Sequence, residues 1–223
     1  MFQVKICGIR DVSDAQSVAA AGADAIGLNF YPESCRYISM ETAEEIVASL
    51  PNGLARVGLF VNATDDEICQ RFDQLGLDFI QLHGDEPPEF LLSLGGRPVI
   101  RAFRLGPSGL RPMVDYLDAC RLPEVNLQAL LIDAYHESAY GGSGMVADWD
   151  RLQSERELLE GLPFILAGGL TAENVAEAVG TVRPAAVDTA SGVEKSPGKK
   201  DPEMVRKFVT AARRALRSVT EGP

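Results

Sequence analysis

Eight short apolar runs, each followed by a segment with helical signals, constrain the fold of this chain more than any other feature. Most of these runs are nearly continuous in apolar residues rather than alternating, which is typical of parallel strands covered on both faces. We predict strands at Gln3–Cys7, Ala25–Phe30, Arg56–Val61, Phe79–Leu82, Val99–Phe103, Ala129–Asp133, Phe164–Ala167 and Ala186–Thr189. The alternation of strands and helices predicts an α/β protein with a parallel sheet.

Capping residues indicate where the intervening helices begin. A side-chain oxygen just before a helix can accept a hydrogen bond from a backbone N–H group that has no partner inside the helix. Residues of this type stand before helical stretches at Asp11, Ser39, Thr64, Thr171 and Asp201. Glu67 completes a capping box with Thr64, and a further helix is predicted over Asp148–Glu160.

Eight strand–helix units can form either a closed (β/α)8 barrel or an open, doubly wound sheet. The 223 residues contain no composition break or linker, so we expect a single domain over residues 1–223. An open sheet usually has a Gly-rich first turn, which Cys7-Gly8-Ile9-Arg10 does not provide. We therefore favour a single (β/α)8 TIM barrel, in which chemistry takes place at the carboxyl ends of the strands.

The charge balance excludes some classes of partner. Lys plus Arg is 21 and Asp plus Glu is 32, which gives a net charge of −11 and argues against binding to nucleic acid or to an anionic membrane. No apolar run approaches the roughly 18 residues of a membrane span, and the N-terminus does not resemble a signal peptide. We expect a cytoplasmic protein whose four cysteines, which form no C-x-x-C pair, are free thiols.

Two reactive side chains stand at the ends of predicted strands. Cys7 ends the first strand and Asp133 ends the sixth. A buried structural thiol is the common alternative for Cys7, and a helix cap is the alternative for Asp133. A carboxylate at the end of an apolar strand is costly to bury unless it is paired or acts as an acid or base. In a closed barrel these strands are three neighbours apart, an arc of about 14 Å, so both side chains can flank a small sugar.

The loops after the seventh and eighth predicted strands are candidates for a phosphate site. They contain Gly168 and Gly169 in the first loop, and Ser191 and Gly192 in the second. These residues leave backbone N–H groups unobstructed, and the helix expected after Thr171 would add its positive end. Tight turns alone would explain one such loop, but two loops at these strands favour a barrel of the phosphate-binding type.

The segment 135–146 after Asp133 is a long loop with several glycines and is a candidate mobile lid. Gly142-Ser143-Gly144-Met145-Val146-Ala147 within it matches G-x-G-x-x-A. Dinucleotide binding is not indicated, because this match neither follows a strand directly nor opens a helix. The sequence also contains no G-x-x-x-x-G-K-[ST] motif of an NTP-binding P-loop.

Arg36 and His83 are candidate substrate-binding residues in loops at the same end of the barrel. Arg36 is either a solvated surface charge or an inward guanidinium suited to a substrate carboxylate. His83 is either a structural hydrogen-bonding residue or part of the site. Together, these candidates offer an acid and a base without a cofactor motif or a metal cluster, which suits proton transfer in an isomerase. We expect no cofactor and no metal.

The sequence resembles the phosphoribosylanthranilate isomerase family through motifs that occur in order along nearly the whole chain. These are Lys5-Ile6-Cys7-Gly8, Gly27…Phe30 with Ser34 and Arg36, Val57-Gly58-Leu59-Phe60-Val61, Gln81-Leu82-His83-Gly84, Gly141-Gly142-Ser143-Gly144, Leu166-Ala167-Gly168-Gly169-Leu170, Ser191-Gly192-Val193-Glu194 and Gly198-Lys199-Lys200-Asp201. The small departures from the family pattern, at Thr189-Ala190 and Cys35, remove no residue to which a role is assigned.

The resemblance implies an Amadori rearrangement of N-(5-phosphoribosyl)anthranilate in tryptophan biosynthesis. We expect the protein to be a monomer or a homodimer. Asp133 looks like the general acid for the furanose ring oxygen, and Cys7 looks like the general base for the C2′ proton. Arg36 is similar to the family's clamp on the anthranilate carboxylate, and the backbone around Gly168, Gly169, Ser191 and Gly192 would hold the phosphate. A thiolate base requires a pKa below about 8.5, for which Lys5, Arg36 and the phosphate-site dipoles are candidate influences.

Other functions stay open on the sequence. Indole-3-glycerol-phosphate synthase needs a lysine and glutamates inside its barrel, whereas the strands here supply only Lys5. Sugar isomerases of the histidine pathway usually have aspartates at the ends of strands one and five, where this chain has Cys7 and Phe103. A non-catalytic barrel that senses a sugar phosphate is a third possibility.

Overall fold

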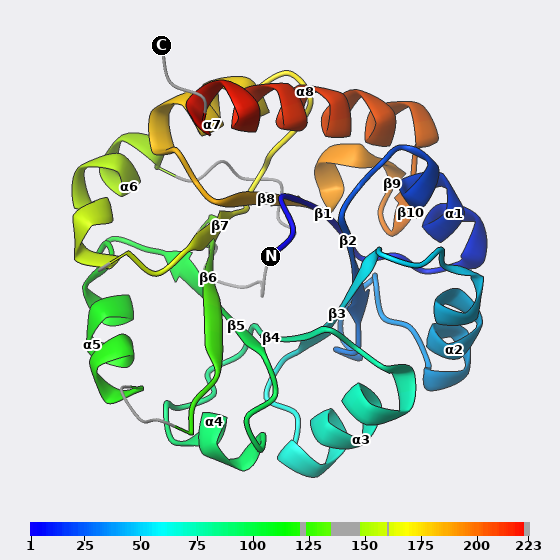
Figure 1. Ribbon diagram of the computed structural model, residues 1–223, viewed down its shortest axis with the longest axis horizontal. Helices are drawn as coiled ribbons and strands as arrows, with labels where there is room; N and C mark the ends of the chain where they lie inside the picture. The colour runs from blue at the N-terminus through cyan, green and yellow to red at the C-terminus, as the bar shows by residue number, and fades with distance from the viewer. Residues whose placement is uncertain (121–123, 135–147, 160, 221–223) are drawn as a thin grey trace.

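In the computed structural model, eight parallel strands close into one barrel in the order β1-β2-β3-β4-β5-β6-β7-β8. The structure describes residues 1–120, 124–134, 148–159 and 161–220. Figure 1 shows the ring of strands with the helices around it. The strands are β1 (Val4–Cys7), β2 (Ala25–Asn29), β3 (Ala55–Phe60), β4 (Phe79–Leu82), β5 (Val99–Leu105), β6 (Leu127–Ala134), β7 (Phe164–Leu166) and β8 (Ala186–Thr189).

The helices lie between the strands in sequence and cover the outside of the barrel (Figure 1). They are α1 (Val12–Ala20), α2 (Met40–Ser49), α3 (Asp65–Leu75), α4 (Phe90–Ser93), α5 (Arg111–Ala119), α6 (Trp149–Glu155), α7 (Val175–Val182) and α8 (Pro202–Thr220). Short 3-10 helices cover Arg156–Leu159 and Ser191–Val193, and a hairpin of β9 (Glu194–Ser196) and β10 (Lys199–Lys200) follows β8. The (β/α)8 barrel predicted from the sequence is confirmed.

All eight predicted strands are present, and two of them, Phe79–Leu82 and Ala186–Thr189, have the predicted bounds. The largest differences are in β5 and β6, which are longer than predicted. These strands pair along their whole length, from Val99 opposite Leu127 to Leu105 opposite Ala134. Pairing over this distance extends both strands beyond their apolar centres.

Most of the predicted helix starts are confirmed by cap hydrogen bonds. The side chains of Asp11, Ser39 and Thr64 accept hydrogen bonds from backbone N–H groups in the first turns of α1, α2 and α3. Asp201 Oδ1 accepts from two backbone N–H groups at the start of α8. At its other end, α3 stops at Gly76, which is in the left-handed conformation with φ 57°.

The expected helix start at Thr171 was wrong, because α7 begins at Val175. The Thr171 backbone N–H donates to Asn174 Oδ1 at 2.8 Å, and Asn174 Nδ2 donates to Gly169 O at 2.9 Å. These bonds make a turn of residues 171–174 instead of a first helical turn. The single helix expected over Asp148–Glu160 is also divided, since α6 ends at Glu155 and a 3-10 helix follows.

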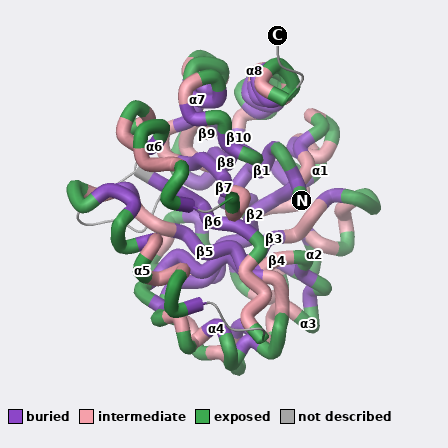
Figure 2. The backbone as a smooth tube through the Cα atoms, turned by 60° about the vertical axis from the view of Figure 1, so that its left-hand side comes forward, coloured by how far each residue is buried: buried purple, intermediate pink, exposed green. Residues whose placement is uncertain are grey.

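Apolar side chains pack both between the strands and helices and inside the barrel. Figure 2 shows the strands as the buried centre of the molecule. Inside the barrel, Phe2 packs with small and branched residues that include Ala25, Ala129 and Ala186. Phe2 contacts Phe79 edge to face, with 5.7 Å between ring centroids. The interior is therefore filled below the carboxyl ends of the strands.

The 19-residue helix α8 is amphipathic and packs against α7 and α1. Its apolar face is buried through Val205, Phe208, Val209, Ala212, Ala215 and Leu216. Within the described ranges, no helix combines the length and the apolar character that crossing a bilayer requires.

Candidate active site

Strand alternation determines which polar side chains reach the barrel interior. Because successive side chains on a strand point to opposite faces, Val4 and Ile6 of β1 pack in the outer core, whereas Lys5 and Cys7 belong to the interior. Both are buried, with Lys5 0% and Cys7 5% exposed. The first strand therefore directs an amine and a thiol to the inside of the barrel.

Cys7 lies in a small apolar cluster with Leu59 and Val61, against which Tyr31 and Ala190 pack. Its neighbour in the β1–β2 register is Gly27. A Cβ atom built on Gly27 would lie 2.6 Å from Cys7 Sγ, so a larger residue there would displace the thiol. Gly27 gives the sulfur its place at the end of β1.

Lys5 and Asp188 form a buried ion pair on adjacent strands. They are register partners in β1 and β8, and Lys5 Nζ lies 3.0 Å from Asp188 Oδ1. Two charges removed from water require such a partner. Burial is the largest single effect and lowers the pKa of Lys5, but the charges and hydrogen bonds of Asp188 and Cys7 together outweigh it and raise that pKa. Lys5 is therefore an ammonium ion beside Cys7.

The thiol of Cys7 is held in its protonated form. Burial raises the pKa of Cys7 above its ordinary value, the charge of Lys5 opposes this effect, and the charge of Asp188 adds to it. The lowered pKa that a thiolate base requires is thus not found, although Lys5, named above as a candidate influence, acts in the required direction.

Asp133 and His83 lie close together at the same end of the barrel. Both are buried, and His83 Nε2 is 3.6 Å from Asp133 Oδ2. The other ring nitrogen, Nδ1, is 3.1 Å from Nε2 of the fully buried Gln81. His83 Nε2 makes no hydrogen bond to the described residues. The structure thus places His83 inside the mouth of the barrel, next to the candidate acid.

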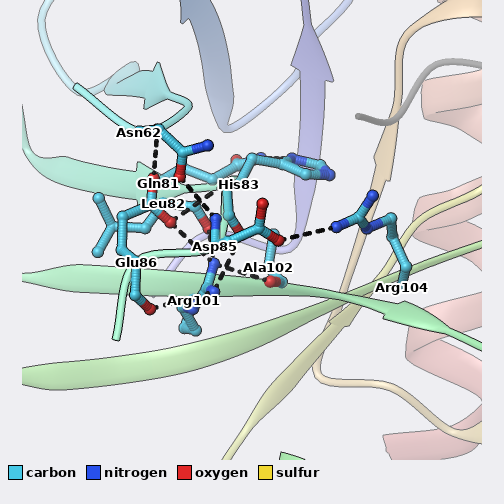
Figure 3. A network of polar contacts seen from close by, with 10 residues as sticks. Asn62, Gln81, Leu82, His83, Asp85, Glu86, Arg101, Ala102 and Arg104 are labelled. Carbon is cyan, nitrogen blue, oxygen red and sulfur yellow. Dashed lines mark hydrogen bonds and ion pairs between the residues drawn. The ribbon is translucent and has the colours of Figure 1, made fainter. Parts of the chain in front are cut away.

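A network of polar contacts fixes the backbone on which His83 lies (Figure 3). The Arg101 guanidinium donates to the carbonyl oxygens of Leu82 and Gly84, each at 3.0 Å. Glu86 accepts from Gly84 N at 3.1 Å and pairs with Arg101 at 3.2 Å. Sequence reasoning did not find Arg101 or Glu86, whose role depends on the folded loop.

One narrow cavity joins the candidate acid to the candidate phosphate loops. It is lined by Asp133, Ala167, Gly168, Gly169, Asp188, Thr189, Ala190 and Ser191. The β7 and β8 loops and the end of β6 therefore meet at one place, as predicted from the order of strands. Asp188, which sequence reasoning did not select, lines this cavity and also binds Lys5 beside Cys7.

The candidate phosphate loops have the close backbone approach that glycine permits. Gly168 and Gly169 have φ values of 87° and 62°, in the left-handed region. A Cβ atom on Gly192 would clash with the carbonyl oxygen of Leu170, to which Thr189 Oγ1 also donates at 2.7 Å. The β8 loop is therefore packed directly against the β7 loop.

Arg36 is turned inward and is not a solvated surface charge. Its Nε and Nη2 atoms donate to the two carboxylate oxygens of Glu194, both at 2.8 Å. Lys200 Nζ donates to Glu194 Oε1 at 2.8 Å and to Ala190 O at 2.9 Å. Glu194 and Lys200 occur in the motifs named above, yet nothing in the sequence links them to Arg36.

Some predictions concern residues that the structure leaves undescribed. The candidate lid at 135–146 lies outside the described residues, and so does Ala147, the last residue of the G-x-G-x-x-A match. In the described ranges, no group of three or more His, Cys, Asp or Glu side chains has the geometry of a metal site. All four cysteines are described, and all four are free thiols.

Comparison with known proteins decides the family. A family model described as N-(5′-phosphoribosyl)anthranilate (PRA) isomerase matches residues 4–211. The chain belongs to this family. An N-(5′-phosphoribosyl)anthranilate isomerase of Acidithiobacillus ferrooxidans is 46% identical over 215 residues, which cover 96% of this chain and 98% of that protein.

Solved structures of phosphoribosylanthranilate isomerases have the same fold. The enzyme of Thermotoga maritima superimposes with a TM-score of 0.83 at 36% identity, covering 96% of this chain and all of that one. Another was solved in complex with reduced 1-(o-carboxyphenylamino)-1-deoxyribulose 5-phosphate and superimposes with a TM-score of 0.81, again at 36% identity and with 96% and 100% coverage.

Proposed function

We propose that Cys7 and Asp133 are the base and the acid of an Amadori rearrangement at this site. As a member of the phosphoribosylanthranilate isomerase family, the chain is an enzyme of tryptophan biosynthesis that converts N-(5-phosphoribosyl)anthranilate to 1-(2-carboxyphenylamino)-1-deoxyribulose 5-phosphate. The observation that most supports the residue assignment is the cavity that Asp133 shares with the β7 and β8 loops, one strand away from Cys7.

Asp133 acts first, as the general acid. Its carboxyl group gives a proton to the furanose ring oxygen while the bond between that oxygen and C1′ breaks. The lone pair of the anthranilate nitrogen forms the C1′=N bond, so ring opening yields a protonated Schiff base. A proton donated to the leaving oxygen avoids the formation of a free alkoxide. We assign His83, whose Nε2 atom lies 3.6 Å from Asp133 Oδ2, to a contact with the sugar beside Asp133.

Cys7 then acts as the general base. Its thiolate removes the C2′ proton, the C–H electrons form the C1′=C2′ bond, and the nitrogen recovers its lone pair. The resulting enolamine becomes the product when C1′ gains a proton and the C2′ hydroxyl loses one. The reaction has no net redox change and no net proton release. The ammonium of Lys5 stabilises the thiolate form of Cys7 at this step.

The remaining candidate residues bind the two charged ends of the substrate. We assign the phosphate to the backbone around Gly168, Gly169, Ser191 and Gly192, which line or abut the cavity. We assign the anthranilate carboxylate to Arg36, whose guanidinium can bind two carboxylates through different edges. Binding at both ends holds the sugar between the acid and the base.

We further propose that residues 1–223 act as one catalytic domain, because the closed barrel uses strands from both ends of the chain. The proposed chemistry needs neither a cofactor nor a metal. The four free thiols support a cytoplasmic location. The small-molecule substrate is the partner, with no nucleic acid or membrane involved, and the enzyme is proposed to work as a monomer or a homodimer.

The direct test is the turnover of purified protein with N-(5-phosphoribosyl)anthranilate, followed by the fluorescence of the anthranilate adduct. We expect the substrate signal to disappear at a rate proportional to enzyme concentration. Saturable binding of the substrate without its consumption would contradict the proposal and favour a non-catalytic sensor.

A further inference from the structure

Arg36 shares its guanidinium with a carboxylate that belongs to the protein itself. Glu194 binds the edge formed by Nε and Nη2, with both distances at 2.8 Å. The second edge, formed by Nη1 and the other hydrogen of Nη2, is not used by Glu194. Two-point binding of this kind fixes the plane of the guanidinium and the direction of its second edge. Glu194 thus determines where Arg36 can present donors to a substrate carboxylate.

Glu194 is in turn held by Lys200, which also contacts the β8 loop. Lys200 Nζ donates to Glu194 Oε1 at 2.8 Å and to the carbonyl of Ala190 at 2.9 Å. The side chains of Glu194 and Lys200 are 4% and 0% exposed, so water does not screen these contacts. Ala190 lines the cavity assigned to the phosphate. The contacts therefore run without a break from Arg36 to the phosphate loop.

The charges of the three side chains fit a single bound anion. Burial lowers the pKa of Lys200, and the charge of Glu194 opposes this effect. With Lys200 protonated, Arg36 and Lys200 contribute two positive charges and Glu194 one negative charge, which leaves one positive charge for one carboxylate. Without Glu194, the cations of Arg36 and Lys200 would lie next to each other in a buried place, and no group would fix the orientation of the Arg36 guanidinium.

We infer that Glu194 and Lys200 are positioning residues, which hold the guanidinium of Arg36 at a fixed place relative to the phosphate loop. They thereby select substrates that carry a carboxylate at the correct distance from the phosphate. This inference rests on the proposed function, since it assigns the substrate carboxylate to Arg36 and the phosphate to the β7 and β8 loops. Neither residue touches the reacting atoms.

The decisive variant is Glu194→Gln, which keeps the size of the side chain and removes its charge. We expect KM for the phosphoribosylanthranilate substrate to rise roughly tenfold while kcat changes less than about threefold. The inhibition constant of inorganic phosphate, a probe of the phosphate loops alone, should stay unchanged. A residue needed only for stability would instead change both constants and kcat together.

A matched control is Asp73→Asn, which removes a carboxylate from a similar two-point pair with Arg97 on the outside of the barrel. We expect no change in KM or in phosphate inhibition for this variant. In the Arg36→Ala background, Glu194→Gln should cause no further rise in KM, because its effect acts through Arg36.

Lys200→Met gives a second, independent test. Methionine fills the space of the buried methylene stem but cannot bond to Glu194 or Ala190. We expect KM and the phosphate inhibition constant both to rise in this variant, because the hydrogen bond from Lys200 to the Ala190 carbonyl in the phosphate loop is lost.

An unchanged or lower KM in Glu194→Gln, or an equal rise in KM and in the phosphate constant, would overturn the inference. These outcomes differ from a failure of the proposed function, in which the unmodified protein itself would show no turnover.

Discussion

The surroundings of Cys7 oppose its proposed role as a base more directly than those of any other candidate site residue. Burial favours the neutral thiol, whereas the proposed reaction uses the thiolate. Lys5 is the neighbouring charge that favours the thiolate, and Asp188 holds Lys5 in its cationic form through a 3.0 Å contact. The thiolate of Cys7 is therefore a minor species at neutral pH, and its fraction increases as the pH rises.

The first prediction concerns the pH dependence of Cys7 reactivity. Alkylation by iodoacetamide requires the thiolate, so the rate at Cys7 should be low at pH 7 and still rising above about pH 8.5. Peptide mapping by mass spectrometry separates Cys7 from the exposed Cys35, which serves as an accessible reference thiol in the same sample. Lys5→Met should slow the reaction of Cys7 further. A rate at Cys7 that is already constant between pH 6 and 8 would show that its pKa is lowered instead.

The second prediction concerns Arg36. Replacing Arg36 with alanine removes the donors for the substrate carboxylate and leaves the acid and base in place, so KM should rise at least tenfold with kcat nearly retained. Steady-state kinetics with the phosphoribosylanthranilate substrate provide the measurement. A large fall in kcat at an unchanged KM would mean that Arg36 does not clamp the carboxylate.

At this scale, the sequence predicted individual side chains at strand ends better than it predicted the contacts between side chains. Cys7, Asp133 and His83 could be placed because each follows an apolar run, and parallel strands bring their ends together. The Lys5–Asp188 pair could not be found, because its members are 183 positions apart and meet only through barrel closure. The same applies to Arg36 and Glu194, which are 158 positions apart.

Among the elements, the β7 and β8 loops depend on each other. Gly192 approaches the Leu170 carbonyl so closely that a methyl group would clash with it. The shape of the proposed phosphate site thus depends on two loops packing together and not on either loop alone. Sequence analysis identified the glycines, but it could not show that one loop restrains the other.

The third prediction follows from this contact. Gly192→Ala must push the two loops apart, so we expect about 2 kcal/mol lower stability and a much weaker inhibition by inorganic phosphate. Urea unfolding and phosphate inhibition of turnover are the two measurements. Gly180→Ala, at a helix position where a Cβ atom meets nothing within 4 Å, is the control and should leave phosphate inhibition unaffected. Normal phosphate inhibition in Gly192→Ala would show that the loop contact does not shape the site.

Helix starts show where pattern reasoning fails for elements. Thr64 and Thr171 both look like caps in the sequence, yet only Thr64 caps a helix. Near Thr171, the side chain of Asn174 competes with the expected helix start, because it accepts a hydrogen bond from Thr171 N and donates one to the Gly169 carbonyl. Local side-chain bonds of this kind hold residues 171–174 in a turn and delay the helix.

For the whole molecule, closure of the barrel makes the ends of the chain interdependent. β8 pairs with both β7 and β1, and α8 covers the outside with six buried apolar residues. The sequence was sufficient to predict this closure, because eight regular strand–helix units with no break leave few other arrangements. It did not predict the hairpin of β9 and β10, whose strands have three and two residues and no apolar run of their own.

The fourth prediction tests the single domain over residues 1–223. A chain that ends at residue 185 lacks β8 and α8, which leaves the edges of β1 and β7 unpaired and part of the apolar core exposed. We expect this truncated chain to show no cooperative thermal unfolding by circular dichroism, unlike the full chain. Cooperative unfolding of the truncated chain would indicate that its first part is an independent domain.

The central claim is that Cys7 and Asp133 carry the proton transfers, and its most direct test separates binding from turnover. Cys7→Ser and Asp133→Asn should each lower kcat by at least 100-fold, while titration calorimetry with the reduced product analogue shows affinity within about threefold of the unmodified enzyme. Substantial kcat in either variant would contradict the account.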